Sequence, residues 1–337
     1  MATLRDVADL AGVDRSTASR VLRDDPVQAA RPETRERILD AARTLGYRPN
    51  GVARSLRTRR TNMIGLVMPD IDNIGFMEVV HGVEEVATER GYLVLLADAK
   101  ALDRNTELYG QLVLEGRVDG LLAAFAKVKD PLIRHLAGRD IPLVLVNRRA
   151  EGVESAVVVD DYRGSRLAVD HLVELGHRSI GHLAGPVDVD TAQRRRQGFV
   201  DALTAHGLDA DPDWITTGGY SEAGGRDAAA TLLGSPRMPT AIFAANLMSA
   251  LGAVQVFRAA GISLPADLSI VAMDEHPVAA HTNPPMTTVA MPLAEMGAEA
   301  ARMLIDALEG QPMGYRVIAT PPRLVVRGST GPPCADR

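Results

Sequence analysis

Polar side chains that directly follow short apolar runs are the residues of this chain best placed to do chemistry. Asp70, Asn147, Asn246 and Asp274 each come just after such a run, and Arg148 follows Asn147. Short apolar runs are typical of buried strands, and ligands of open parallel sheets bind beyond the carboxyl ends of those strands. We therefore expect these side chains to converge on one binding cleft. The full candidate set is Asp70, Phe76, Asn147, Arg148, Asp160, Arg195, Tyr220, Asn246 and Asp274.

The residue types in this set favour a neutral ligand that carries several hydroxyl groups. Asp and Asn side chains bind pairs of hydroxyls, and an arginine donates two hydrogen bonds from one fork. Phe76 and Tyr220 could stack on such a ligand. Other interpretations remain open: Asp160 could cap the following helix, Phe76 could belong to the core, and Arg195 could belong to a solvated run of three arginines.

Sequence motifs of common enzymes are missing from the chain. It contains no GxxxxGK[ST], HExxH or GxSxG pattern. The paired glycines at 218–219 and 224–225 flank an expected helix start, but they lack the spacing of a dinucleotide-binding motif, so a glycine-rich turn is favoured. We expect no cofactor and no enzymatic activity.

Two acidic patterns could suggest a metal site, and neither fits one well. Residues 209–213 have Asp at every second position, as a calcium-binding loop does. However, Trp214 stands where such a loop has glycine, and Tyr220 stands where it has its closing glutamate. Residues 274–276 are three neighbours at an expected strand end and cannot all face one ion. The single cysteine, Cys334, excludes an intrachain disulfide and a cysteine-based cluster, and fits a reducing cytoplasm. We expect no metal.

The net charge of −6 is distributed unevenly along the chain. Residues 1–60 hold 13 arginines, no lysine and 8 acidic residues, a net charge of +5, whereas the rest of the chain carries −11. A basic segment on an acidic body suggests that this segment contacts a polyanion. Aromatic residues make up only 4% of the chain, too few for an extended stacking surface on single strands.

The first 22 residues have the spacing of a helix-turn-helix. Thr3 can cap a helix that Gly12 ends, and Asp14 can cap a second helix. Ala8, four residues before Gly12, is small enough for the close approach of the two helices, and Val21 helps to close the contact. The second helix exposes side chains that can bind base edges or phosphates. These are Arg15, Ser16, Thr17, Ser19 and Arg20.

A third helix and a short basic segment are expected next. Pro32 suits the first turn of the helix, Glu33 and Glu36 suit its positive end, and Gly46 ends it. Residues 51–60 follow, and they contain four arginines.

The segments TLRDVADLAGVDRSTASRVL and ETRERILDAARTLGYRPNGVARSL carry a family resemblance. They resemble the DNA-binding head and hinge of the lactose-repressor (LacI/GalR) family of bacterial transcription regulators, and the resemblance continues to about residue 330. It implies that Arg15, Ser16 and Arg20 read the major groove. It also implies that residues 53–56 form a hinge helix whose Leu56 wedges into the minor groove. The implied DNA-binding set is Thr3, Arg15, Ser16, Thr17, Ser19, Arg20, Tyr47, Asn50, Ala53, Leu56 and Arg57.

The chain departs from the common family pattern at several places. Asp14 stands where serine is usual, Arg23 where asparagine is usual and Arg31 where a small cap is usual. In the body, Asn147 replaces a common aspartate and Leu247 follows Asn246 where aspartate is often found. The pocket is therefore less acidic than a common sugar site. We expect a sugar or sugar derivative, with a sugar phosphate, nucleoside or purine as open alternatives.

The body alternates apolar runs with amphipathic helical patterns. This alternation predicts parallel sheets with both faces covered, and two such sets lie before and after about residue 160. The fold class we predict is α/β: an all-α helix-turn-helix head joined by a hinge helix to a two-lobed periplasmic-binding-protein-like body. The predicted boundaries are head 1–50, hinge and linker 51–60, body 61–330 (first lobe 61–159 plus 291–319, second lobe 160–290 plus 320–330) and tail 331–337.

These patterns together predict a sequence-specific transcriptional regulator, a repressor, under the control of a small-molecule effector. A homodimer on near-palindromic operator DNA is expected, because one head reads only a few base pairs. A helix carrying Val79, Val83 and Val86, together with the lobe to which it belongs, is a candidate dimer interface. A cytoplasmic location is expected, because the start of the chain has no apolar signal sequence and the chain has no run of 18 apolar residues. A solute-binding protein is the second hypothesis and an enzyme the third.

Overall fold

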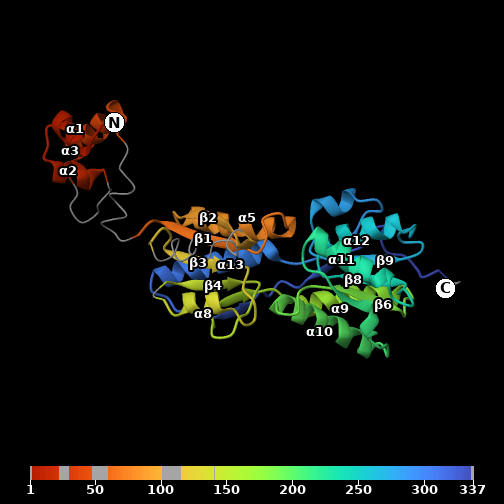
Figure 1. Ribbon diagram of the computed structural model, residues 1–337. Helices are drawn as coiled ribbons and strands as arrows, with labels where there is room; N and C mark the ends of the chain where they lie inside the picture. Colours follow the sequence, from red (N-terminus) through yellow and green to blue (C-terminus); the bar gives the residue numbers. More distant parts are fainter. Residues whose placement is uncertain (1, 23–29, 48–59, 101–114, 140, 335–337) are drawn as a thin grey trace. The chain divides into compact units, whose positions relative to one another are not determined.

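A computed structural model describes residues 2–22, 30–47, 60–100, 115–139 and 141–334 of the chain (Figure 1). The chain divides into two compact units, Met1–Thr61 and Asn62–Arg337, here termed the head and the body. In the described segments, no helix is both long enough and apolar enough to cross a membrane.

The head consists of three helices with well-defined caps. The helices are α1 (Leu4–Ala11), α2 (Arg15–Val21) and α3 (Pro32–Thr44). Thr3 and Asp6 form a reciprocal capping box at the start of α1, and Gly12 ends this helix with a left-handed φ of 61°. Arg31 gives α3 no side-chain cap, so Pro32 in its first turn is the remaining start signal.

Small side chains let the three head helices pack around one core. Ala8 and Ala18 are buried where α1 and α2 meet, and Ile38 of α3 is fully buried between them. Alanine at these positions brings two helix backbones close together, which is the arrangement expected for a helix-turn-helix. The outer face of α2 is left to polar side chains.

The first lobe of the body is built on a six-stranded parallel sheet. Its strand order is β11-β5-β4-β3-β1-β2. β1 pairs in register with both β2 and β3, with Gly65 opposite Leu95 and Leu121. The strands are β1 (Met63–Met68), β2 (Leu93–Asp98), β3 (Gly120–Ala123), β4 (Leu143–Val146), β5 (Ala156–Val158) and β11 (Tyr315–Val317). The helices are η1 (Ile74–Phe76), α5 (Met77–Glu89), α8 (Pro131–Ala137) and α13 (Leu293–Leu308).

The second lobe repeats this plan with one antiparallel strand at its edge. Its strand order is β12-β10-β9-β8-β6-β7, and only β12 runs against its neighbour. The strands are β6 (Ile180–Ala184), β7 (Ile215–Thr217), β8 (Ala241–Ala244), β9 (Ser269–Met273), β10 (Thr287–Ala290) and β12 (Arg323–Val325). The helices are α9 (Asp161–Glu174), α10 (Asp190–Ala205), η2 (Pro212–Trp214), α11 (Glu222–Leu233), α12 (Leu247–Ala259) and η3 (Pro277–His281).

The chain passes between the two lobes three times. It leaves the first sheet after β5 and enters the second lobe at α9, returns after β10 to form α13 and β11, and leaves again for β12. Both sheets therefore contain strands from distant parts of the sequence, and three neighbouring segments connect the lobes. Segments of this kind allow two lobes to change their separation while each core stays intact.

Close helix packing buries the apolar face of α5 inside its own lobe. A Cβ atom at Gly82 would collide with the backbone of Ala294, so α5 and α13 approach at a distance that only glycine permits. Val79, Val83 and Val86 are buried in the core of the first lobe by this contact. The valine face of α5 is therefore covered within the chain, and the expectation that this helix and its lobe form a dimer interface stays a prediction.

A histidine lies in the core of the second lobe. His182 is fully buried and stacks against Phe199 and Phe243, at ring-centroid distances of 5.0 and 4.8 Å. Its Nδ1 is 2.9 Å from the Phe243 carbonyl oxygen, so this nitrogen carries the proton and donates. Burial lowers the pKa of His182 to about 4, from an ordinary value near 6.5. The ring is therefore neutral at neutral pH.

The buried His182 predicts acid sensitivity of the body. Its pKa is lower in the folded than in the unfolded chain, so stability is lost as pH falls from about 6.5 towards 4. That difference corresponds to about 3 kcal/mol of unfolding free energy. Urea unfolding at several pH values should show that the unfolding free energy of His182→Phe falls less between about pH 6.5 and 4 than that of the wild type. His81→Gln, at an exposed position, should leave the loss unchanged, and an unchanged profile for His182→Phe would contradict the assignment.

Candidate functional site

The exposed face of α2 holds an ordered set of polar side chains. Asp14 caps the helix and accepts hydrogen bonds from the backbone N–H groups of Ser16 and Thr17, both at 2.9 Å. The hydroxyls of the same two residues also donate to its carboxylate, at 2.5 and 2.6 Å. Arg20 donates to the Thr17 hydroxyl at 3.0 Å, and Arg15 is exposed at the start of the helix. One carboxylate therefore orients Ser16 and Thr17, and Thr17 in turn contacts Arg20.

Hydrogen bonding keeps this carboxylate ionised. The side chain of Ser16, then that of Thr17, holds the pKa of Asp14 well below its ordinary value. A serine at this position could cap the helix, but it could not accept four hydrogen bonds. The departure from the usual residue at position 14 thus fixes the orientation of Ser16 and Thr17 before any DNA is bound.

The remaining head residues predicted to bind DNA fall into two groups. Thr3 is committed to the α1 cap, and Tyr47 packs against the head core after α3. Ser19 is partly buried on α2. Asn50, Ala53, Leu56 and Arg57 lie outside the residues that the structure describes.

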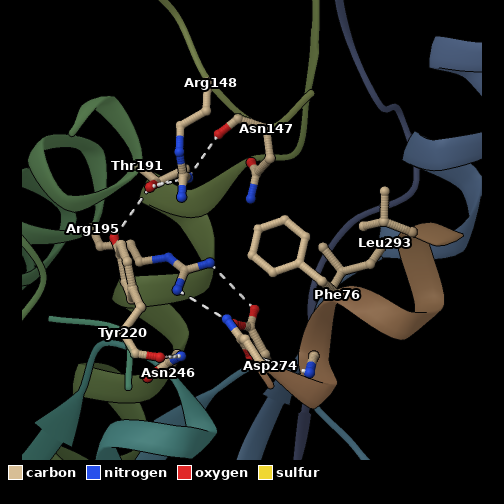
Figure 2. Close-up of a pocket in the computed structure, with 12 residues that line it drawn as sticks. Phe76, Asn147, Arg148, Thr191, Arg195, Tyr220, Asn246, Asp274 and Leu293 are labelled. Carbon is tan, nitrogen blue, oxygen red and sulfur yellow. Dashed lines mark hydrogen bonds and ion pairs between the residues drawn. The ribbon is translucent and has the colours of Figure 1, made fainter. Parts of the chain in front are cut away.

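The body contains a pocket whose lining comes from both lobes (Figure 2). Figure 2 shows Phe76 and Leu293 of the first lobe facing Arg195 and Tyr220 of the second. The space between the lining atoms, counted together with the open solvent at its mouth, amounts to about 340 Å³. The lining residues are Asn73, Gly75, Phe76, Val79, Asn147, Arg148, Thr191, Arg195, Tyr220, Asn246, Asp274 and Leu293.

Two residues proposed from the sequence are absent from this lining. Asp70 forms an ion pair with Lys100 at 2.5 Å. Asp160 caps α9, because its carboxylate accepts from the backbone N–H of Arg163 at 3.0 Å. The structure brings the other candidates together in the lining: Phe76, Asn147, Arg148, Arg195, Tyr220, Asn246 and Asp274.

Sequence reasoning missed two polar residues of the lining. Thr191 precedes Arg195 by four residues on α10, a spacing that places both on one helix face, so helical periodicity could have found it. Asn73 caps η1 through the backbone N–H of Gly75 and is buried. Its position in an irregular loop gave no periodic signal. The apolar residues Val79 and Leu293 were likewise indistinguishable from core residues in the sequence.

Two strand ends present side chains to the pocket through a left-handed backbone. Asn147, after β4, has a φ of 52° and Asp274, after β9, has a φ of 71°. Asn and Asp tolerate this region better than most residues, and such backbone conformations concentrate at functional sites. The Oδ1 atom of Asn147 is buried and has no hydrogen-bond partner within the described residues. A ligand hydroxyl could donate to this oxygen.

A buried ion-pair network positions Arg195. Its Nε donates to Asp161 Oδ1 at 2.7 Å, and its Nη2 lies 3.2 Å from Asp274 Oδ1. Arg194 pairs with the same Asp161 at 2.6 Å and with Asp190 at 3.0 Å. Burial alone would lower the pKa of Arg195, but the charges of Asp274 and Asp161 outweigh it and raise that pKa above its ordinary value. Arg195 is therefore a fixed cation.

Tyr220 lies against two arginines. The guanidinium carbons of Arg148 and Arg195 lie 5.7 and 5.6 Å from the centre of its ring, within range of a cation–π interaction. Its hydroxyl is 3.1 Å from the hydroxyl of Thr191. Burial raises the pKa of Tyr220, so the phenol remains protonated.

The start of α10 links the two lobes directly. Arg148 of the first lobe donates to the Thr191 hydroxyl at 2.6 Å, and Arg149 pairs with Asp190 at 2.8 Å. The backbone N–H of Val128 donates to the carbonyl of Asp188 at 2.9 Å. The helix that carries Arg195 into the pocket is therefore also the helix that contacts the opposite lobe.

Metal-binding patterns do not assemble in the described part of the chain. No group of three or more His, Cys, Asp or Glu side chains is arranged there to hold a metal ion. In the alternating run that resembles a calcium loop, Asp211 instead caps η2 by accepting from the backbone N–H of Asp213 at 3.0 Å. This run is accordingly a helix-capping turn.

Comparison with known proteins identifies the family. Residues 3–50 match the family described as bacterial regulatory proteins, lacI family, and residues 169–330 match a periplasmic binding protein-like domain. The HTH-type transcriptional repressor CytR of Escherichia coli (strain K12) is 34% identical over 332 residues, which cover 98% of this chain and 96% of that protein. This chain belongs to the lacI family of bacterial regulatory proteins. It is a DNA-binding transcriptional repressor of that family and not an enzyme.

Two solved structures of transcription regulators are similar to nearly the whole chain. A transcriptional regulator CelR–cellobiose complex has 35% identity and a TM-score of 0.73, covering 98% of this chain and 100% of that one. The lac repressor dimer bound to operator and the anti-inducer ONPF has 27% identity and a TM-score of 0.84, covering 98% and 99%. The predicted fold class, a helix-turn-helix head with a two-lobed α/β body, is confirmed.

Adjacent aspartates before and in α9 provide a matched test of the network. Asp161→Asn leaves Arg194 and Arg195 buried with too few carboxylates, so the unfolding free energy of the body should fall by about 3–5 kcal/mol. Asp160→Asn keeps a side-chain oxygen that can cap α9. It should therefore change the unfolding free energy of the body by about 0.5 kcal/mol or less. Urea denaturation measures both, and equal losses would contradict the network as described.

Proposed function

We propose that a small molecule bound in the body pocket controls the affinity of this repressor for its operator. The observation that supports this proposal is that polar side chains from both lobes line one pocket. The first lobe contributes Asn147 and Arg148, and the second contributes Arg195, Asn246 and Asp274. A ligand that contacts both sides stabilises one lobe separation over others. A site with this property can act as a switch.

The chemistry of the lining favours a sugar or sugar derivative as the effector. Asp274 and Asn147 are suited to hydroxyl groups, and Phe76 and Tyr220 offer ring faces to the apolar side of a sugar. The solved CelR relative holds cellobiose, which supports this class. Nucleosides and purines remain alternative ligands, because the same polar groups can bind a ribose or a base.

The DNA-binding form we propose is a homodimer on near-palindromic operator DNA in the cytoplasm. A single helix-turn-helix reads only a few base pairs, and a two-fold dimer matches a two-fold site. The lac repressor relative is a dimer on its operator, which supports this arrangement. A pure solute-binding protein, the alternative, would have no use for the ordered polar face of α2.

The switch we propose runs through the segment between head and body. Residues 51–60 hold Arg54, Arg57, Arg59 and Arg60, and a short segment of like charges is a poor helix until phosphates neutralise it. On DNA, Leu56 would then enter the minor groove at the centre of the operator. Ligand binding would change the separation of the two lobes, and through it the spacing of the two hinge segments in a dimer. We propose the head, hinge and lobe boundaries predicted from the sequence as the units of this mechanism.

Base reading by the head can be separated from phosphate binding. Arg15→Ala should weaken binding to the operator by about 1–3 kcal/mol while leaving binding to random DNA nearly unchanged. Arg57→Ala should weaken both and reduce the slope of log affinity against log salt by about one ion. Gel-shift titrations on a selected operator and a scrambled duplex, at several salt concentrations, measure both. Equal losses on the two duplexes for Arg15→Ala would refute its base-reading role.

A further inference from the structure

Arg148 is a buried cation without a counter-ion. The residue is 4% exposed, and in the described segments no carboxylate lies within ion-pair distance of its guanidinium. Its Nη1 donates to the Asn147 carbonyl at 3.1 Å and to the Thr191 hydroxyl at 2.6 Å, both neutral oxygens. Removing a charge from water costs free energy unless an opposite charge replaces the lost hydration. Arg148 therefore occupies a position that is unfavourable in the ligand-free protein.

The surrounding network cannot supply the missing charge. Asp161 is shared by Arg194 and Arg195, Asp274 pairs with Arg195, and Asp190 pairs with Arg149 and Arg194. Each carboxylate of the network is therefore already used, and the network together with Arg148 carries one positive charge in excess. The four arginines are Arg148, Arg149, Arg194 and Arg195, and the three acids are Asp161, Asp190 and Asp274.

One nitrogen of the Arg148 guanidinium is left without a hydrogen bond. Its Nε is buried and has no partner within the described residues, and the residue as a whole lines the pocket. The Nε–Nη2 edge of an arginine is a two-donor fork that fits a carboxylate or phosphate. Burial lowers the pKa of Arg148, and the positive charges of Arg195 and Arg194 add to this effect against the attraction of Asp161. An anion on the fork would reverse this unfavourable balance.

We propose that the effector carries a carboxylate or phosphate group that pairs with Arg148, so that it is a sugar acid or a sugar phosphate. This inference rests on the proposed effector function of the pocket, and it narrows the ligand class from sugars in general to anionic ones. The hydroxyl-binding groups, Asn147 and Asp274, hold the sugar ring in this arrangement. The positive end of α10, where Thr191 lies, adds a favourable field for the anion.

Matched sugar sets test the proposal on the full-length protein. Isothermal titration compares glucose with glucuronate and glucose 6-phosphate, galactose with galacturonate and galactose 6-phosphate, and ribose with ribose 5-phosphate. We expect at least one acidic member to bind about tenfold or more tightly than its neutral parent. The uronate and phosphate arms show which anion the fork accepts. The proposal is overturned if no acidic member binds, or if a neutral parent binds as tightly as its acidic partners.

Variants at two adjacent arginines assign the preference to Arg148. Arg148→Gln should reduce the ratio of acidic-sugar to neutral-sugar affinity to about twofold or less, and Arg148→Lys should retain part of that ratio. Arg149→Gln removes a neighbouring, half-exposed arginine that is paired with Asp190, and should keep the preference. A preference that survives Arg148→Gln would overturn the assignment.

The stability of the ligand-free protein separates a binding role from a structural one. Because the charge of Arg148 is uncompensated without ligand, Arg148→Met should leave the thermal unfolding temperature unchanged or raise it. A clear fall would mean that Arg148 acts as a structural cation and would count against the proposal. Gel shifts on the same preparations report operator binding independently. A wild-type protein that binds no DNA, with or without sugar, would contradict the proposed function. A neutral effector that releases or promotes DNA binding would contradict only the present inference.

Discussion

The fixed position of Arg195 is the constraint on which the pocket depends. Asp161 lies fully buried beneath it and holds Arg194 as well, so one carboxylate orients two guanidiniums from a single helix. Charges buried at this depth are tolerated only when paired and hydrogen-bonded, which makes the arrangement rigid. Rigid side chains of this kind bind a ligand at a lower entropic cost than mobile ones. The second lobe therefore presents a preorganised half of the site.

The same helix connects this rigid half to the other lobe. α10 carries Arg195 into the pocket, and at its start Asp190 and Thr191 contact Arg149 and Arg148 of the first lobe. Contacts between lobes that include a ligand-facing residue such as Arg148 are sensitive to what occupies the pocket. A change there alters the balance between lobe separations without altering either core. We propose this as the physical route by which a small molecule acts on DNA binding in this repressor.

The sequence predicted the fold class because its signals are local, whereas several site features depend on tertiary contacts. Capping residues such as Thr3 and Asp14, and apolar runs such as 63–68, indicate helices and strands directly. Strands of three residues, such as β7 and β12, are too short to show a period. The neighbours Asp160 and Asp161 look equivalent in the sequence, and only the packing of α9 against α10 decides which one is buried under Arg195. The packing partner of the α5 valines could not be found from the sequence for the same reason, since α13 lies more than 200 residues later.

The central claim, that the pocket controls operator binding, implies a reciprocal coupling between ligand and DNA. The most direct measurement is isothermal titration of a ligand identified by binding to the body, performed on the free repressor and on the repressor saturated with operator. The factor between the two ligand affinities should equal the factor by which saturating ligand changes operator affinity, typically about 5–150-fold. Ligand affinity that is the same with and without operator would contradict the claim.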